Sequence, residues 1–91
     1  MAGKQKKIFD VLFREKPVLM LTTLLNTSEE MYASTLAKAV DCTYSHVVKL
    51  LQEFHKAGLI SFDRQGRLKI LHLTKKGKEI ATYLDKVEKT L

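Results

Sequence analysis

The spacing of apolar residues changes twice along this chain, and that change restricts the fold more than any other feature. Up to Gly58 the apolar side chains recur every three or four residues, as in helices that bury one face, except in the nearly all-apolar segment 17–26, which predicts a largely buried helix. Two short strand-like runs follow, residues 59–62 and 68–73, with Gly66 between them. The helical spacing returns after Thr74. The pattern therefore predicts a mainly helical α+β protein with one β-hairpin.

A length of 91 residues allows one hydrophobic core, so we expect a single domain over residues 1–91. No apolar run approaches the ~20 residues of a membrane-spanning helix. We therefore expect a cytoplasmic protein without a membrane partner. No His, Cys or carboxylate set has the spacing of a metal or catalytic site, so neither a cofactor nor enzymatic activity is expected. Cys42 has no partner for an intramolecular disulfide and is interpreted as a turn cysteine.

The element boundaries follow from capping and turn residues. We predict helices over 6–13, 17–26 (with Pro17 as its first residue), 34–40 (with Ser34 as its N-cap), 44–57 and 75–90. Gly58 ends the fourth helix, and Thr74 caps the fifth. Met31 and Tyr32 form a very short strand. Residues 1–7 carry three lysines and form either a flexible basic arm or a frayed terminus.

Positive charge is concentrated in the second half of the chain. The net charge is +6, and residues 44–91 hold ten of the sixteen Lys and Arg residues but five of the ten acidic ones. Such a one-sided distribution favours a polyanionic partner. A solvated basic surface without a partner is the competing interpretation.

Three segments resemble parts of a known fold. Residues 34–40 resemble the first helix of a helix-turn-helix, and residues 44–60 resemble a recognition helix that runs into a wing strand. Leu73-Thr74-Lys75-Lys76-Gly77, with Ala81 four residues on, is similar to the L-T-x-K-G-x-x-x-A start of the helix after a wing. Together they resemble MarR-like and related archaeal winged helix-turn-helix transcriptional regulators. The resemblance implies a three-helix core, a two-stranded wing, a C-terminal helix and double-stranded DNA as the partner.

The predicted recognition helix 44–57 has two different faces. Val47, Leu50, Leu51 and Phe54 make one apolar stripe at helical spacing. Ser45, Lys49, Gln52 and Lys56 lie opposite, where a major groove would accept hydroxyl, amide and cationic groups. Tyr44 and Val48 lie on one shoulder and would contact thymine methyl groups, and His46 lies on the other shoulder. The alternative is an ordinary solvated helix face.

The predicted hairpin tip, residues 63–69, is polar and basic. In a winged helix such residues contact the DNA backbone or the minor groove, although charges also protect hairpin edges from aggregation. Ser34, Thr35 and Thr43 offer hydroxyl contacts to phosphates, with helix capping as an equally simple role. The candidate DNA-binding residues are thus Ser34, Thr35, Thr43, Tyr44, Ser45, His46, Val48, Lys49, Gln52, Arg64, Gln65, Arg67 and Lys69.

These observations lead to the hypothesis of a sequence-specific transcriptional regulator. A protein-interaction winged helix within a larger assembly and a non-specific, chromatin-like DNA-binding protein are the alternatives. We expect a homodimer, because Ile80, Leu84, Val87 and Leu91 recur at coiled-coil spacing on the last helix. Part of that stripe can instead cover the protein's own core. The sequence does not indicate whether a small-molecule effector exists.

Overall fold

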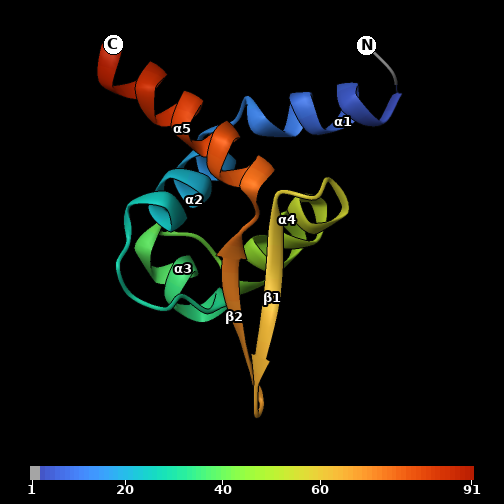
Figure 1. Cartoon of the computed structure of the whole chain (residues 1–91), viewed down its shortest axis with the longest axis vertical. Coiled ribbons are helices and arrows are strands. Elements are labelled where there is room, and N and C mark those ends of the chain that lie inside the picture. Colours follow the sequence, from blue (N-terminus) through green and yellow to red (C-terminus); the bar gives the residue numbers. More distant parts are fainter. Residues whose placement is uncertain (1–2) are drawn as a thin grey trace.

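The computed structural model describes the backbone of residues 3–91 and the side chains from Ile8 onward. Its elements, in order, are α1 (Gly3–Leu12), α2 (Glu15–Asn26), α3 (Ala33–Ala39), α4 (Tyr44–Lys56), β1 (Ile60–Gln65), β2 (Leu68–Leu73) and α5 (Lys75–Thr90). The prediction of a mainly helical α+β protein with one hairpin is confirmed. Figure 1 shows that the hairpin projects from the helices, with its turn at one end of the molecule and α1 and the end of α5 at the other.

The first two helices begin earlier than the sequence predicts. The helix expected to begin at residue 6 begins at Gly3, so the expected flexible arm is helical from there on, and its Met1 and Ala2 lie outside the described residues. The second helix begins at Glu15, so the prediction that Pro17 is its first residue is wrong. Pro17 is the third residue, which is equally compatible with a helix because none of the first four N–H groups has an intrahelical acceptor.

The assignment of Ser34 as the N-cap of α3 is also wrong. Tyr32 is the N-cap, and Ser34 lies within the first turn. Thr35 explains the earlier start, since its Oγ1 accepts a hydrogen bond from the Tyr32 backbone N–H at 2.8 Å and donates to the Tyr32 carbonyl at 3.0 Å. Thr35 therefore provides the hydrogen bonds at the start of α3 that Ser34 was expected to provide as an N-cap.

The core forms where the apolar stripe of α4 meets the other helices. The predicted stripe residues Val47, Leu50, Leu51 and Phe54 are all buried. Met20 and Leu21 of α2 and Leu36 of α3 are fully buried in the same cluster. Helix α5 packs along α2, and α3 packs against α4. Helix α3 and strand β1 thus pack on the core side of α4, and its opposite face is left in solvent.

The hairpin is longer on its first strand than predicted. Strand β1 continues to Gln65, which pairs with Leu68, so only Gly66 and Arg67 make the turn. Gly66 has a φ of 62°, which suits the first position of a two-residue hairpin turn. The very short strand predicted at Met31 and Tyr32 is confirmed only at Met31, which forms an isolated bridge in which the Leu71 N–H donates to the Met31 carbonyl at 2.9 Å. Tyr32 is instead the N-cap of α3.

The base of the hairpin is fixed to both neighbouring helices. Gly58 ends the α4 segment with a φ of 76°, as predicted. Thr74 caps α5 by accepting a hydrogen bond from the Gly77 N–H at 3.0 Å, and its hydroxyl donates to the Gly58 carbonyl at 2.6 Å. The Thr74 N–H also donates to the Leu59 carbonyl at 3.0 Å. One threonine therefore joins the end of α4, the hairpin and the start of α5.

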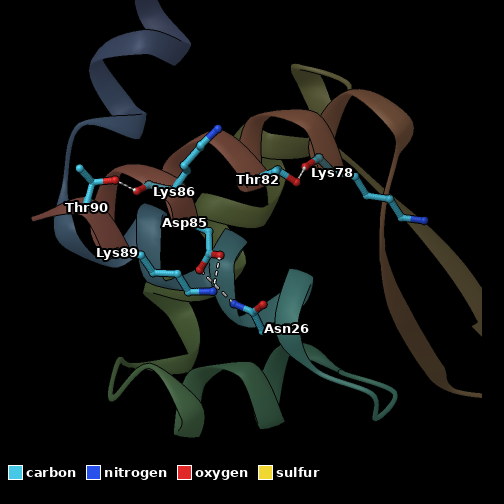
Figure 2. A network of polar contacts seen from close by, with 7 residues as sticks. All are labelled: Asn26, Lys78, Thr82, Asp85, Lys86, Lys89 and Thr90. Carbon is cyan, nitrogen blue, oxygen red and sulfur yellow. Dashed lines mark hydrogen bonds and ion pairs between the residues drawn. The ribbon is translucent and has the colours of Figure 1, made fainter.

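A polar contact joins the ends of α2 and α5. Asp85 accepts an ion-paired hydrogen bond from Lys89 at 2.9 Å and a second hydrogen bond from the Asn26 amide at 3.3 Å (Figure 2). Asn26 is the last residue of α2, so this contact fixes that end of α2 to α5. Each helix within residues 3–91 is too short or too polar to cross a membrane.

Candidate functional site

A tight turn between α3 and α4 orients the candidate recognition helix. Helix α3 ends at Ala39, α4 begins at Tyr44, and Asp41 between them adopts a left-handed φ of 52°. Thr43 caps α4, because its Oγ1 accepts a hydrogen bond from the His46 N–H at 3.3 Å. This is the predicted helix-turn-helix arrangement, with α4 as its second helix.

The outward face of α4 is polar and basic. Ser45, Lys49, Gln52 and Lys56 are exposed on the side opposite the core stripe. No acidic residue lies in the first turn of α4, and its last turn carries His55 and Lys56. The face therefore offers hydroxyl, amide and cationic groups in the combination that base edges and phosphates require.

A hollow lies between α4 and the hairpin, and we call it the wing hollow. Its volume is about 380 Å³. Six of the predicted DNA-binding residues line it: Ser34, Tyr44, Val48, Gln52, Arg67 and Lys69. Tyr32, Ala33, Leu51, Phe62, Leu68 and Leu71 complete the lining, which contains no acidic side chain. The hollow thus joins helix and hairpin residues in one surface with positive charge at its rim.

Basic side chains gather near the hairpin tip. Arg64 and Lys69 are direct cross-strand partners, and Arg67 lies in the turn beside them. Like charges directly opposite one another destabilise a strand pair. Among the described side chains, residues 8–91, the ion pair joins Lys89 to Asp85, so none of these three wing residues forms one. Lys69 instead places its Nζ 5.4 Å from the centre of the Phe62 ring. An anionic partner would relieve this repulsion.

The other predicted residues lie outside the wing hollow. Ser45, His46 and Lys49 are exposed on α4, and Arg64 and Gln65 are exposed on β1. Thr35 and Thr43 use their hydroxyls in the caps of α3 and α4. A phosphate contact from either threonine therefore competes with its capping bond.

Sequence analysis missed Leu68 as a residue of this surface. The alternation along β2 groups Leu68 with the buried Ile70, but Leu68 is 50 % exposed because it lies near the hairpin tip, beyond the helices. Its position next to the Gly66–Arg67 turn was the available signal. Phe62, which is 36 % exposed and beside Lys69, was missed for the same reason.

The predicted dimerisation stripe of α5 is divided between two environments. Ile80 and Leu84 are half-buried against the protein's own core. Val87 is 59 % exposed and Leu91 fully exposed. Leu84, Val87 and Leu91 line a groove of about 510 Å³ between α5 and the junction of α1 and α2, together with Leu12, Phe13, Arg14, Glu15, Val18, Leu19 and Glu88. Phe13, at that junction, is 69 % exposed.

Comparisons with known proteins agree with this geometry. An uncharacterised protein of Archaeoglobus fulgidus is 30 % identical over 80 residues, which cover 85 % of this chain and 84 % of that protein. The crystal structure of AF1382 from Archaeoglobus fulgidus has a TM-score of 0.81 at 27 % identity, covering 91 % of this chain and 94 % of that one. No family model matches the sequence.

Two bacterial structures share the fold at lower identity. MepR, a transcription regulator of the Staphylococcus aureus multidrug efflux pump MepA, has a TM-score of 0.74 at 24 % identity, covering 96 % of this chain and 71 % of that one. The MarR family transcriptional regulator SPO1453 from Silicibacter pomeroyi has a TM-score of 0.76 at 19 % identity, covering 96 % of this chain and 65 % of that one. The fold is thus the winged helix-turn-helix of MarR-like proteins, and the chain belongs to the same family as its Archaeoglobus fulgidus relative.

Proposed function

We propose that this protein is a transcriptional regulator that binds specific double-stranded DNA sequences. Helix α4 enters the major groove, and the wing, residues 63–69, contacts the backbone or the minor groove. The observation that carries the proposal is the basic cluster of Arg64, Arg67 and Lys69, which forms no ion pair among the described side chains and lies beside the polar face of α4. Helix and wing would thereby contact one DNA duplex together. The fold shared with MepR and SPO1453, both named as regulators, supports the same function.

The two parts of the surface have different tasks in this proposal. Ser45, Lys49 and Gln52 follow one another at one-turn spacing on the exposed face of α4, where they read base edges. Arg67 and Lys69 bind phosphates irrespective of sequence, so they supply affinity and its salt dependence. A matched pair of variants tests this division. Gln52→Ala relaxes sequence preference, while Arg67→Ala weakens all duplexes alike and lowers the salt slope by about one counterion per subunit.

The decisive experiment reverses one charge on α4. Lys49→Glu places a carboxylate against phosphates and is expected to abolish DNA binding in a fluorescence anisotropy titration. The melting temperature should stay unchanged because Lys49 is exposed. Lys86→Glu, an equally exposed lysine on α5, is the control and should bind as the wild type does. If Lys49→Glu binds DNA normally, the protein-interaction alternative is favoured.

Specificity is tested separately from binding. A titration of wild type with a duplex selected from a random pool and with unselected DNA, at two salt concentrations, should show tighter binding of the selected duplex. The ratio of the affinities for the selected and the unselected duplex should grow as salt rises, because non-specific binding depends mainly on phosphate contacts and these weaken with salt. Equal affinity for both duplexes would contradict sequence specificity and favour a chromatin-like coating protein.

We also propose that two copies associate through the groove between α5 and the α1–α2 junction. Its exposed residues Phe13, Val87 and Leu91 are apolar, and its rim carries Arg14 beside Glu15 and Glu88. A two-fold interface brings each patch against its own copy, so Arg14 of one subunit would face a carboxylate of the other. Two α4 helices would then contact half-sites about one helical turn of DNA, or more, apart.

Light scattering of two matched variants tests the dimer. Val87→Glu places a charge in the groove and should yield monomers. Tyr83→Glu lies one turn away on α5, is equally 59 % exposed and does not line the groove, so it should remain dimeric. A monomeric wild type at high micromolar concentration contradicts the dimer and leaves DNA binding to be judged by Lys49→Glu.

A further inference from the structure

The wing hollow has an apolar side that phosphate binding does not explain. Tyr44 is 59 % exposed and Leu68 is 50 % exposed, and both line the hollow with the half-buried Val48. Tyr44 and Val48 lie one turn apart on α4, while Leu68 comes from β2, so two separate elements contribute apolar surface to one place. Such exposed apolar surface, rimmed by polar groups, marks a contact site.

A polar residue continues this surface along α4. Gln52 lies one turn beyond Val48 and also lines the hollow. In the major groove, a glutamine amide matches the N6 and N7 atoms of adenine, and the C5 methyl of thymine is the apolar group that DNA presents. An A·T pair therefore offers the adenine edge to the Gln52 amide and the thymine methyl to the apolar side chains of α4.

The charge of the hollow identifies its occupant as DNA. Arg67 and Lys69 line the hollow, and no carboxylate does. An apolar peptide or a neutral small molecule would leave both cations without a partner, whereas a DNA strand brings phosphates to the cations and thymine methyls to the apolar side.

We propose that the wing hollow is a specificity site for A·T base pairs, in which Val48 and Tyr44 contact thymine methyl groups and Gln52 binds the adenine edge. This inference rests on the proposed DNA binding and adds which base pairs are preferred. Loss of one buried methyl contact corresponds to about a fourfold loss of affinity.

The test removes single methyl groups from the DNA. A duplex is selected from a random pool with the wild-type protein, and each thymine is replaced in turn by deoxyuridine, which lacks only the methyl. We expect at least one thymine per half-site at which the replacement weakens wild-type binding about fourfold. At that position the penalty should shrink in Val48→Ala or Tyr44→Ala. The penalty compares the thymine and deoxyuridine duplexes bound by the same variant. Partial unfolding lowers both affinities alike and therefore does not change it.

Controls separate the two levels of the proposal. Tyr83→Ala removes an equally exposed tyrosine far from the hollow and should keep the full deoxyuridine penalty. Replacing the paired adenine with 7-deazaadenine should weaken the wild type and leave Gln52→Ala unaffected. If deoxyuridine has no effect at any position, or both apolar variants keep the full wild-type penalty, the A·T site is overturned. DNA binding itself would still stand if Lys49→Glu abolished it, whereas failure of the wild type to bind any duplex overturns both.

Discussion

The ammonium of Lys16 donates hydrogen bonds to the Val40 carbonyl at 2.7 Å and to the Asp41 carbonyl at 3.1 Å. Lys16 lies in the first turn of α2, and Val40 is the C-cap of α3. The lysine thus satisfies carbonyls at the end of α3, where a positive charge is also favoured by the helix dipole. Because Asp41 begins the turn to α4, α2 stabilises the junction that orients the recognition helix.

Lys16→Met should therefore lower the free energy of unfolding by about 1 kcal/mol, because the carbonyls lose a charged donor while the aliphatic packing is kept. Urea unfolding followed by circular dichroism measures the change. Lys86→Met is the control, since Lys86 is exposed on α5, and it should stay within roughly 0.5 kcal/mol of wild type. Equal stabilities of the two variants would show that the contact contributes nothing.

Gly77 and Gly66 should respond very differently to alanine. A Cβ at Gly77 would lie 1.8 Å from the Leu59 carbonyl oxygen, so α5 would have to move away from the hairpin base. At Gly66 there is open space, and only the positive φ is unfavourable for alanine. We expect Gly77→Ala to cost about 3 kcal/mol or more and Gly66→Ala about 1 kcal/mol, measured by urea unfolding. The reverse order would contradict the close approach of α5 to Leu59.

Comparison of sequence and structure shows which kinds of information are local. The helix order, the α4 stripe and the ends at Gly58 and Thr74 were predicted correctly, because capping and periodicity act within a few residues. The start of α3 was not, because its N-cap is Tyr32, which is not a typical capping residue, and Thr35 bonds the Tyr32 backbone from within the first turn.

Longer-range features of the site had no sequence signal. Lys16 contacts a carbonyl 24 residues away, and nothing in the sequence links the two. Alternation along β2 predicts which face Leu68 occupies but not how far the hairpin extends beyond the helices, so its exposure could not be predicted. The exposed face of α4 was predictable because burial of its stripe fixes the opposite side.

Asp85 should make stability depend on acidic pH. The hydrogen bond from Lys89 is the main cause that holds the pKa of Asp85 below its ordinary value, with help from Asn26 and against the effect of burial. The stabilisation is therefore present above the ordinary carboxyl pKa and is lost as pH falls through the lowered one. Asp85→Asn should melt below wild type at neutral pH, and the difference should disappear in strong acid.

Glu30→Gln is the control for that pH series, because Glu30 is an exposed carboxylate outside α5 and outside the proposed dimer groove. It should follow the wild-type melting profile closely across the range. A constant difference between Asp85→Asn and wild type from neutral to strongly acidic pH would assign the effect to packing rather than to ionisation.

Phe62 should matter for the wing's affinity more than for folding. Its ring centre lies 5.1 Å from that of His55 on α4 and 5.4 Å from Lys69 Nζ, so it positions the lysine beside the recognition helix. Phe62→Ala should weaken DNA binding roughly threefold, the size of a lost cation–π contact. Phe62→Trp should restore it. Anisotropy titrations measure both, and unchanged affinity of the alanine variant would contradict the positioning role.

The bond between the Thr74 N–H and the Leu59 carbonyl has a consequence for how the protein can diversify. It closes the hairpin at its base, so the exposed residues 61–69 extend away from the body of the protein and return to it at the buried Ile70 and Leu71. A segment closed in this way can be lengthened or exchanged at its tip with little effect on the helices that anchor it. The exposed part of the wing can therefore be replaced as a unit, and its contacts can differ between relatives while the arrangement of the helices is kept.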